Sequence, residues 1–434
     1  MSFYPLRSVD SDSLFFRPGD TLVLVGELFD RGYANGLVQA ALRRGMRVIE
    51  GTVGRRDENH GLRPLREEEL KEKKYEWVNI PLEAGFEWEV ASDGLHLMDR
   101  LKELKLAEWE SFSVPKDLIN ESRIKGEQRL FRNLQNFCAE IEKRVPSGNI
   151  LFAHLMAGGV PKNKVVLSLL NRVVRGTGEK FLSSKKLWDS PLGWVINENF
   201  KAVTAWSFQL LLEASSELRE KMMQQGRIVA YSAYGYHGTE IFISGQLRWQ
   251  SYAPYLQGWA KLLLEDLARK ARQQGILATV FNCPEILTHS SSIFQGVEVP
   301  LYPLWNILWQ YGNHPFVRHL EGNCQMKLKS GVTLSEVVKM CEQTYAEPDL
   351  AILFDFARWP QHNEKQQLEK LISVSDHIMQ MHENPKNLLT FDLSEVVLEA
   401  CGEVMLKYFQ QYQEPVVWIG HDLVGSEIVR LKNQ

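Results

Sequence analysis

The sequence predicts an α/β protein whose central sheet is mostly parallel and is covered by helices on both faces. Short apolar runs rich in valine and isoleucine alternate with amphipathic segments from Thr21 to Phe281, which is the pattern of a doubly wound sheet. The chain has 434 residues, and 44% of them are hydrophobic, enough for one large core. We therefore expect a single domain with helical insertions.

Six strands follow from these apolar runs. They are expected over residues 21–25, 45–50, 75–82, 149–154, 226–231 and 275–281. Helical periodicity is expected between them, up to residue 44 and over residues 63–74, 96–105, 120–143, 193–221 and about 252–274. Residues 163–192 are expected to form an irregular, basic insertion, and the chain beyond Pro348 to add strands and helices to the same body.

Charge, cysteine and histidine patterns exclude several classes of function. The 50 basic and 54 acidic residues leave a net charge of −4, so we expect no nucleic-acid partner. No apolar run approaches the roughly 18 residues of a membrane-spanning helix, so no membrane insertion is expected. The five cysteines form no C-x-x-C pair, which favours a reducing, cytoplasmic location. The histidines show no H-x-x-x-H spacing, so we expect no metal.

A glycine-bearing turn follows the first predicted strand. Gly26, Gly32 and Gly36 lie between that strand and an amphipathic stretch. Glycines let the backbone approach a pyrophosphate, and a helix amino terminus directs free N–H groups at it. The spacing differs from the usual G-x-G-x-x-G, and a simple turn with a helix cap explains the glycines equally well. The turn is therefore a candidate phosphate cradle, and Gly158, in the turn after the fourth strand, is a second place where a cofactor can pass.

The end of the second strand bears on the choice of nucleotide. Glu50 lies about where such folds hold the adenosine ribose. A carboxylate accepts hydrogen bonds from free ribose hydroxyls, whereas Arg55 or Arg56 would attract a ribose phosphate. The sequence leaves NADH and NADPH open, with a lean to NADH.

Tyr252 and Lys261 carry the second chemical signal. A hydride-transfer site needs a neutral acid to hold a developing oxyanion and a fixed cation beside it. The two residues open a helical segment after a strand. They are about two and a half turns apart on a helix, so the pair fits the chemistry best if Tyr252 lies in the loop before the helix.

These motifs together resemble the enoyl-thioester reductases of the short-chain dehydrogenase/reductase superfamily. Tyr252 and Lys261 match the Y-x8-K motif of the long FabV-type reductases of enoyl-ACP and enoyl-CoA. Gly26, Gly32 and Gly36 match the places of the FabI-type turn, which reads G-x5-S-x3-G. The resemblance implies a Rossmann-like, doubly wound fold.

Further site residues are implied by the same resemblance. Tyr234 ends a segment similar to the family's tyrosine-serine-tyrosine strand end, where a second tyrosine approaches the substrate. Ile286 and Thr288 begin a segment, running on to Ser292, that resembles the family's nicotinamide contact. Glu83 is the candidate for an acidic residue that meets adenine. The segment between Tyr234 and Tyr252 is longer than in the family.

The resemblance implies reduction of the 2,3-double bond of a 2-enoyl thioester, carried on acyl carrier protein or coenzyme A, in fatty-acid synthesis. Tyr252 would protonate the enolate, Lys261 would hold the nicotinamide ribose, and Tyr234 would flank the thioester. We expect residues 20–160 and 193–300 to form the cofactor-binding core. Residues 301–345 would form substrate-binding helices, and residues 346–434 a C-terminal extension.

Two alternatives remain open at this point. A nucleotide-binding relative that has lost turnover and serves as a sensor or scaffold has some support from the altered glycine turn and from the single lysine, because FabV-type motifs carry two and here Leu262 follows Lys261. A ketoacyl or hydroxysteroid dehydrogenase is disfavoured because neither Tyr252 nor Tyr255 has the Y-x3-K spacing. Acyl chain length and oligomeric state are not specified by the sequence.

Overall fold

The computed structural model describes residues 4–9, 15–113, 115–252, 255–288, 294–411 and 414–433. Its centre is an eight-stranded sheet in the order β1-β12-β11-β8-β7-β2-β3-β6, in which each neighbouring pair is parallel. These strands are β1 (Pro5–Leu6), β2 (Thr21–Val25), β3 (Arg47–Thr52), β6 (Glu76–Pro81), β7 (Ile150–His154), β8 (Val229–Tyr234), β11 (Leu277–Asn282) and β12 (Val416–Ile419). Two antiparallel hairpins join β4 (Arg55–Arg56) to β5 (Leu62–Arg63) and β9 (Thr239–Ile243) to β10 (Gln246–Gln250).

The strand order confirms the predicted Rossmann-like fold. The six strands expected from the sequence are β2, β3, β6, β7, β8 and β11, and along the sheet they run third, second, first, fourth, fifth and sixth. In this order the chain changes direction between β2 and β7. Ligands of doubly wound sheets bind in the crevice at the carboxyl ends of the strands at this point.

Helices make up most of the remaining chain. They are α1 (Tyr33–Arg43), α2 (Glu67–Leu70), α3 (Leu97–Arg100), α4 (Lys116–Arg144), α5 (Lys164–Arg175), α6 (Ser184–Trp188), α7 (Pro191–Lys201), α8 (Ser207–Ala214), α9 (Ser216–Gln224), α10 (Gly258–Gln273), α11 (Trp305–Leu308), α12 (Pro315–Met326), α13 (Leu334–Ala346), α14 (Pro348–Ala351), α15 (Lys365–Met381), α16 (Thr390–Gln411) and α17 (His421–Leu431). A π-helical segment, Ala202–Trp206, joins α7 to α8, so the predicted helix over 193–221 is present in several pieces.

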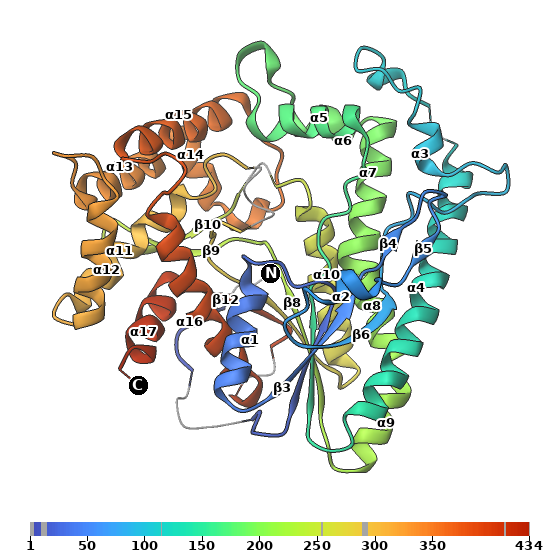
Figure 1. Cartoon of the computed structure of the whole chain (residues 1–434). Coiled ribbons are helices and arrows are strands. Elements are labelled where there is room, and N and C mark those ends of the chain that lie inside the picture. The colour runs from blue at the N-terminus through green and yellow to red at the C-terminus, as the bar shows by residue number, and fades with distance from the viewer. Residues whose placement is uncertain are drawn as a thin grey trace.

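The two faces of the sheet carry separate helical layers. On one face, α4, α8 and α10 pack against side chains such as Val23, Phe152 and Tyr231. On the other face, α1 and α16 pack against the alternate residues, such as Leu22 and Leu151. Successive strand side chains point to opposite faces, so each strand, buried on both, is a continuous apolar run. Figure 1 shows the strands between α4 and α9 on one side and α1 and α16 on the other.

Helices α1 and α16 cross at glycines. A Cβ atom on Gly36 would overlap the Leu398 carbonyl, and one on Gly402 would overlap the backbone of Gly36. Only glycine allows two helix backbones to approach this closely. Gly36, predicted from the turn motif, therefore lies at a helix–helix crossing.

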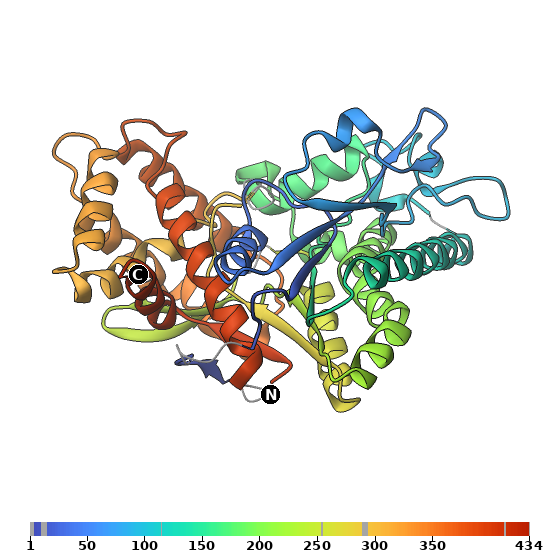
Figure 2. The ribbon, with the colours of Figure 1, turned by 60° about the horizontal axis from the view of Figure 1, so that its bottom comes forward.

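The C-terminal segment completes the core. It supplies β12, which pairs with both β11 and β1, and α16, which covers α1. It also supplies α14 and α15, which join α11, α12 and α13 in a helical lobe beside the sheet (Figure 2). The lobe contacts the sheet body through hairpin β9–β10 and the 3₁₀ segment Val299–Leu304. No helix in the described part of the chain is both long and apolar enough to cross a membrane.

Three sequence predictions of local structure were wrong. Residues 163–192 are largely helical, because Asn163 caps α5 by accepting the Val165 and Val166 N–H groups and the apolar face of α5 packs inward. The charged helix predicted over 63–74 shrinks to α2, whose cap is closed by Glu69. The helix over 96–105 shrinks to α3.

Candidate functional site

A pocket opens at the point where the strand order changes direction. Its wall is built from the segments that follow β2 and β7, with Glu27 and Leu155 among them, and from the carboxyl ends of β8 and β11. The predicted residues Gly32, Tyr234, Lys261, Ile286 and Thr288 all line it. The other predicted residues, Tyr252, Gly26, Gly36, Glu50, Arg55, Glu83 and Gly158, are not among its lining residues.

The amino terminus of α1 faces this pocket. Gly26 follows β2 with a φ of 124°, and a Cβ atom there would press on Leu155 and Met156 in the turn after β7. Gly32 is the residue before α1, and Tyr33 and Asn35 of its first turn line the pocket. The Asn35 amide donates to the Phe29 carbonyl at 2.7 Å and so holds the turn. The free N–H groups of α1 make this end of the pocket suited to a phosphate.

The turn after β7 has the conformational freedom that the sequence suggested. Gly158 has a φ of 102° and open space where a Cβ would stand, and Ala157 before it lines the pocket. The serines at 290–292, which continue the predicted nicotinamide segment after Thr288, lie outside the described residues.

The charged residues around the adenosine end are held in ion pairs. Glu50 is buried, and its carboxylate accepts from Lys73 at 2.6 Å and from the Leu28 N–H at 3.2 Å. Arg55 donates to Glu27 at 2.7 Å. Glu50 therefore holds the glycine turn through the Leu28 N–H, and Arg55 is neutralised by the Glu27 carboxylate of the pocket wall.

Glu83 has a comparable role on the neighbouring loop. Arg56 forks onto both of its oxygens and extends to Glu89. Arg129 binds Glu89 at 2.7 Å and the Glu83 main-chain carbonyl at 2.8 Å. These contacts make Glu83 part of an ion-pair network that anchors α4.

Lys261 is a buried cation at the centre of the pocket. Only 4% of the residue is exposed, and its Nζ donates to the main-chain carbonyl of Tyr234 at the end of β8. Burial lowers the Lys261 pKa to about 8, with the Glu265 charge opposing the shift. Glu265 is in turn held by the Asn282 amide at 3.0 Å, so the charge beside Lys261 is fixed in place.

Besides Tyr33 of α1, three tyrosines line the pocket with this lysine: Tyr234, Tyr236 and Tyr255. The rings of Tyr236 and Tyr255 are 3.7 Å apart between centroids. Among the described atoms, the buried hydroxyls of Tyr234 and Tyr236 have no hydrogen-bond partner. Burial raises the pKa of all three phenols, so each keeps its proton near neutral pH.

Tyr252 lies one layer behind these residues. It precedes α10, as predicted, but it is 1% exposed and its hydroxyl donates to the Gln295 carbonyl at 3.1 Å. Its ring meets Phe294 edge-on, with 5.9 Å between centroids, and Phe294 lines the pocket. Phe294 and Tyr255 thus stand between Tyr252 and the space where a ligand would lie.

Glu285 is a buried acid in the pocket wall. Neither carboxyl oxygen has a direct hydrogen-bond partner in bonding geometry within the described part of the chain, although Tyr236 and Gln250 lie close enough to favour its charge. Burial outweighs them and raises the Glu285 pKa to about 8, so the group holds a proton at neutral pH. A protonated carboxyl beside two phenols is a local proton store.

Sequence reasoning missed Tyr236, Tyr255 and Glu285. Tyr255 is nearer than Tyr252 to Lys261 along the chain, and Glu285 follows the carboxyl end of a predicted strand. These positions are visible in the sequence, but neither residue belongs to a motif with a known spacing. The described residues hold no cluster of three or more histidine, cysteine or acidic side chains arranged for a metal.

The fold and the pocket define a class. A doubly wound sheet with a helix amino terminus, a buried lysine and neutral phenols meeting at its switch point is the arrangement expected of a nucleotide-dependent reductase.

Comparisons with known proteins agree with this class. The model of the enoyl-acyl carrier protein reductase family FabMG matches residues 2–428. An apo structure of FabMG, described as a novel type of enoyl-acyl carrier protein reductase, is 40% identical with a TM-score of 0.95, over 100% of this chain and 99% of that one. An NADH-bound structure of FabMG is 35% identical with a TM-score of 0.79, over 99% of both chains. No curated protein sequence matches the chain.

The chain belongs to the FabMG family of enoyl-acyl carrier protein reductases. It is an oxidoreductase.

Proposed function

We propose that this protein uses NADH to reduce the 2,3-double bond of a 2-enoyl thioester carried on acyl carrier protein, as a cytoplasmic step of fatty-acid synthesis. The observation that carries this proposal is the joint presence of Lys261, Tyr255 and the α1 amino terminus in one pocket. The lysine and the phenol can stabilise the negative charge of an enolate, and the N–H groups at the helix end can bind the phosphates of a dinucleotide.

The preference for NADH rests on the ion pairs at the adenosine end. Glu50, in β3 next to β2, is buried and bound to Lys73, so this lysine is also unavailable to a ribose phosphate. Arg55 and Arg56, the cations that a ribose phosphate would need, are already bound to Glu27 and Glu83. The NADH in a FabMG relative supports the same choice.

Bound NADH supplies a hydride to the β-carbon of the substrate. The electron pair of the double bond then moves toward the thioester oxygen, where negative charge develops. We propose that Tyr255 donates its proton to this oxygen, because it is the phenol that shares the pocket wall with Lys261 and precedes α10. The resulting enol then tautomerises: it loses the O–H proton and gains a proton at Cα, which gives the saturated thioester. Lys261 would hold the nicotinamide ribose, and its charge would stabilise the enolate.

Tyr252 is the competing assignment for the acid, in the FabV-like Y-x8-K reading of the motif. It would need Phe294 to move and would need to give up its bond to the Gln295 carbonyl. For these reasons we favour Tyr255, with Tyr252 as its support and Tyr234 beside the thioester.

Glu285 completes the proposed proton path. After Tyr255 has given up its proton, the phenolate would take one from the Glu285 carboxyl, and solvent would then reprotonate Glu285. The burial of Glu285 beside Tyr236 and Tyr255 supports this role. The acyl chain would extend toward the helices of residues 301–345.

Turnover of a short enoyl substrate tests the function. Purified protein with crotonyl acyl carrier protein should oxidise NADH, followed by its nicotinamide absorbance, with butyryl product identified by mass spectrometry. NADPH should be used with a much higher KM. Binding of NADH without any turnover of crotonyl or longer enoyl thioesters would instead indicate a sensor or scaffold.

A further inference from the structure

We propose that a basic groove along α5 is the docking site for an acidic surface of the acyl carrier protein, an inference that rests on the function proposed above. The groove is lined by Lys164, Leu167, Arg172, Arg175 and Lys180, together with small polar residues. It lies in the segment for which sequence reasoning found no role.

The charge of the groove has one sign. No acidic side chain lines it. Lys164, Arg172 and Lys180 form no ion pair with any carboxylate in the described ranges, whereas the nearby Lys185 and Lys186 are neutralised by Asp189 at 2.6 Å and Glu110 at 2.7 Å. The field of the groove is therefore left for an anionic partner.

The groove is also rigid and has an apolar centre. Helix α5 is strongly amphipathic, and its inner residues Val166, Leu169 and Val173 are fully buried in the core. Leu167 faces outward and is 48% exposed between the basic side chains. Arg172 further braces the floor, since its Nε donates to the Lys180 carbonyl at 3.1 Å. An exposed apolar residue surrounded by basic side chains is the pattern of a protein contact.

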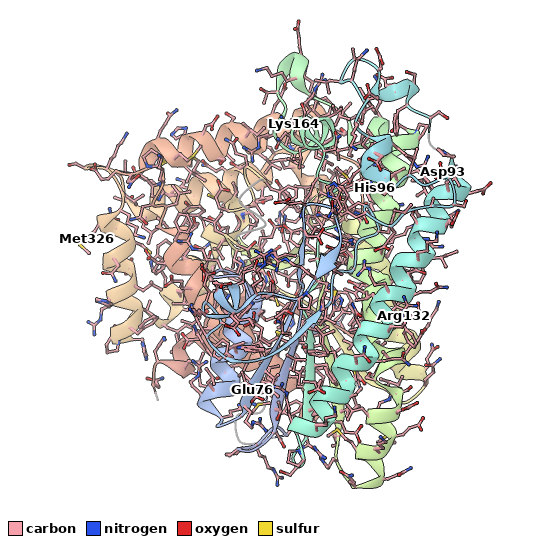
Figure 3. The ribbon with its side chains drawn as sticks, turned by 45° about the vertical axis from the view of Figure 1, so that its right-hand side comes forward. Glu76, Asp93, His96, Arg132, Lys164 and Met326 are labelled. Carbon is pink, nitrogen blue, oxygen red and sulfur yellow. The ribbon has the colours of Figure 1, made fainter. Side chains whose placement is uncertain are left out.

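Both ends of α5 lead toward elements of the reactive pocket. Helix α5 begins just after the β7 turn, where Leu155 and Ala157 line the pocket. At its other end Arg175 is close enough for its charge to oppose the burial that raises the pKa of Tyr252, and Tyr252 packs on Phe294 of the pocket wall. Figure 3 shows Lys164 at the end of the molecule opposite Glu76, the residue that begins β6. The groove therefore lies on the carboxyl side of the sheet, where a carrier must stand to insert its thioester arm.

An acidic carrier fits these features better than a lipid or a nucleic acid. The substrate's thioester arm is bound to a small protein, so a docking surface near the pocket must recognise that protein. A carrier helix rich in aspartate and glutamate, with an apolar residue between them, would complement Lys164, Arg172, Lys180 and Leu167.

Paired substrates test this proposal. The variant Lys164→Glu/Lys180→Glu should raise KM about tenfold or more for crotonyl acyl carrier protein. Its KM for the neutral N-acetylcysteamine thioester of crotonate should not change. The matched control Lys329→Glu/Lys339→Glu reverses two exposed lysines of the helical lobe and should leave both KM values unchanged.

The salt dependence of KM and the removal of the exposed Leu167 side chain provide two further tests that do not depend on the charge-reversal variant. For the wild type, KM for the carrier substrate should rise with ionic strength while that for the neutral thioester stays constant. Leu167→Ala should raise only the carrier KM, by about threefold to tenfold. Equal KM changes for both substrates, or a carrier KM that ignores salt and the charge reversal, would overturn the docking site. Absence of turnover with both substrates in the wild type would instead overturn the function.

Discussion

The side chain of Lys261 donates a hydrogen bond to the main-chain carbonyl of Tyr234, so the end of β8 positions the cation that α10 presents. Because the acceptor is a main-chain carbonyl of a strand, the position of the ammonium does not depend on the rotamer of a partner side chain. This arrangement keeps a charge at one point of a buried pocket, which is what stabilisation of a developing oxyanion requires.

Replacing this cation should remove catalysis and leave the fold intact. Lys261→Met keeps a similar length and removes a buried charge, so it should lower kcat/KM by about a hundredfold or more with little loss of stability. Stopped enzyme assays and thermal unfolding check this result. A Lys261→Met enzyme that retains near wild-type kcat would contradict the role of the charge.

The phenols can be distinguished by removing single hydroxyls. Tyr255→Phe should lower kcat by about a hundredfold or more while NADH binding, measured by fluorescence titration, stays the same. Tyr252→Phe should change kcat by less than about threefold, because its hydroxyl serves the Gln295 carbonyl. The opposite ranking would assign the acid to Tyr252 and restore the Y-x8-K reading.

The pH profile should report Glu285. Both Lys261 and Glu285 must be protonated in the proposed mechanism, and burial moves the pKa of each to about 8. Activity should therefore be full below this value and fall as the pH rises through it, with a limiting logarithmic slope of about two. Glu285→Gln should lower kcat and reduce that slope to about one. An unchanged slope would remove Glu285 from the proton path.

The glycine crossing of α1 and α16 should tolerate no side chain. Gly36→Ala places a Cβ on the Leu398 carbonyl, so we expect loss of several kcal/mol of unfolding free energy or no soluble protein. Gly322→Ala is the control, because Gly322 lies in α12 with open space around it. That change should stabilise the protein by about 0.5–1 kcal/mol, measured by denaturant unfolding. A folded, fully stable Gly36→Ala protein would contradict the crossing.

Two buried histidines should make the fold acid-sensitive. Burial lowers the pKa of His154 and His421 to about 3, whereas both would titrate near 6.5 in the unfolded chain. The unfolded state then binds more protons between these values. Stability is therefore present above about pH 6.5 and is lost as the pH falls toward 3, by up to about 1.4 kcal/mol per pH unit for each histidine. His421→Gln should show a shallower loss than the wild type in urea unfolding at pH 4 to 7, and an equal slope would refute the assignment.

Local patterns predicted the inner sheet because each of its strands is a compact apolar run between turn residues. Lys261, Tyr234, Ile286 and Thr288 were placed at one pocket because parallel strands end at one edge. The choice between Tyr252 and Tyr255 lay beyond the sequence, since it depends on how Phe294 packs.

Other elements depend on distant pairing. Strand β12 joins β11 across more than a hundred residues of helical chain, so its run of four apolar residues had no local partner to identify it. Hairpin β9–β10 did carry a sequence signal, the Ser244-Gly245 dipeptide. Both residues have a positive φ in its turn. It accounts for the extra residues between Tyr234 and Tyr252.

The contact between Gly36 and Gly402 also has a consequence for biosynthesis. At translation rates of about 5–20 residues per second, the ribosome makes Gly402 roughly 20 to 70 seconds after Gly36. During that interval the nascent nucleotide-binding half exposes the apolar face of α1 that α16 later covers. The core between these two helices therefore closes only after nearly the whole chain has been made.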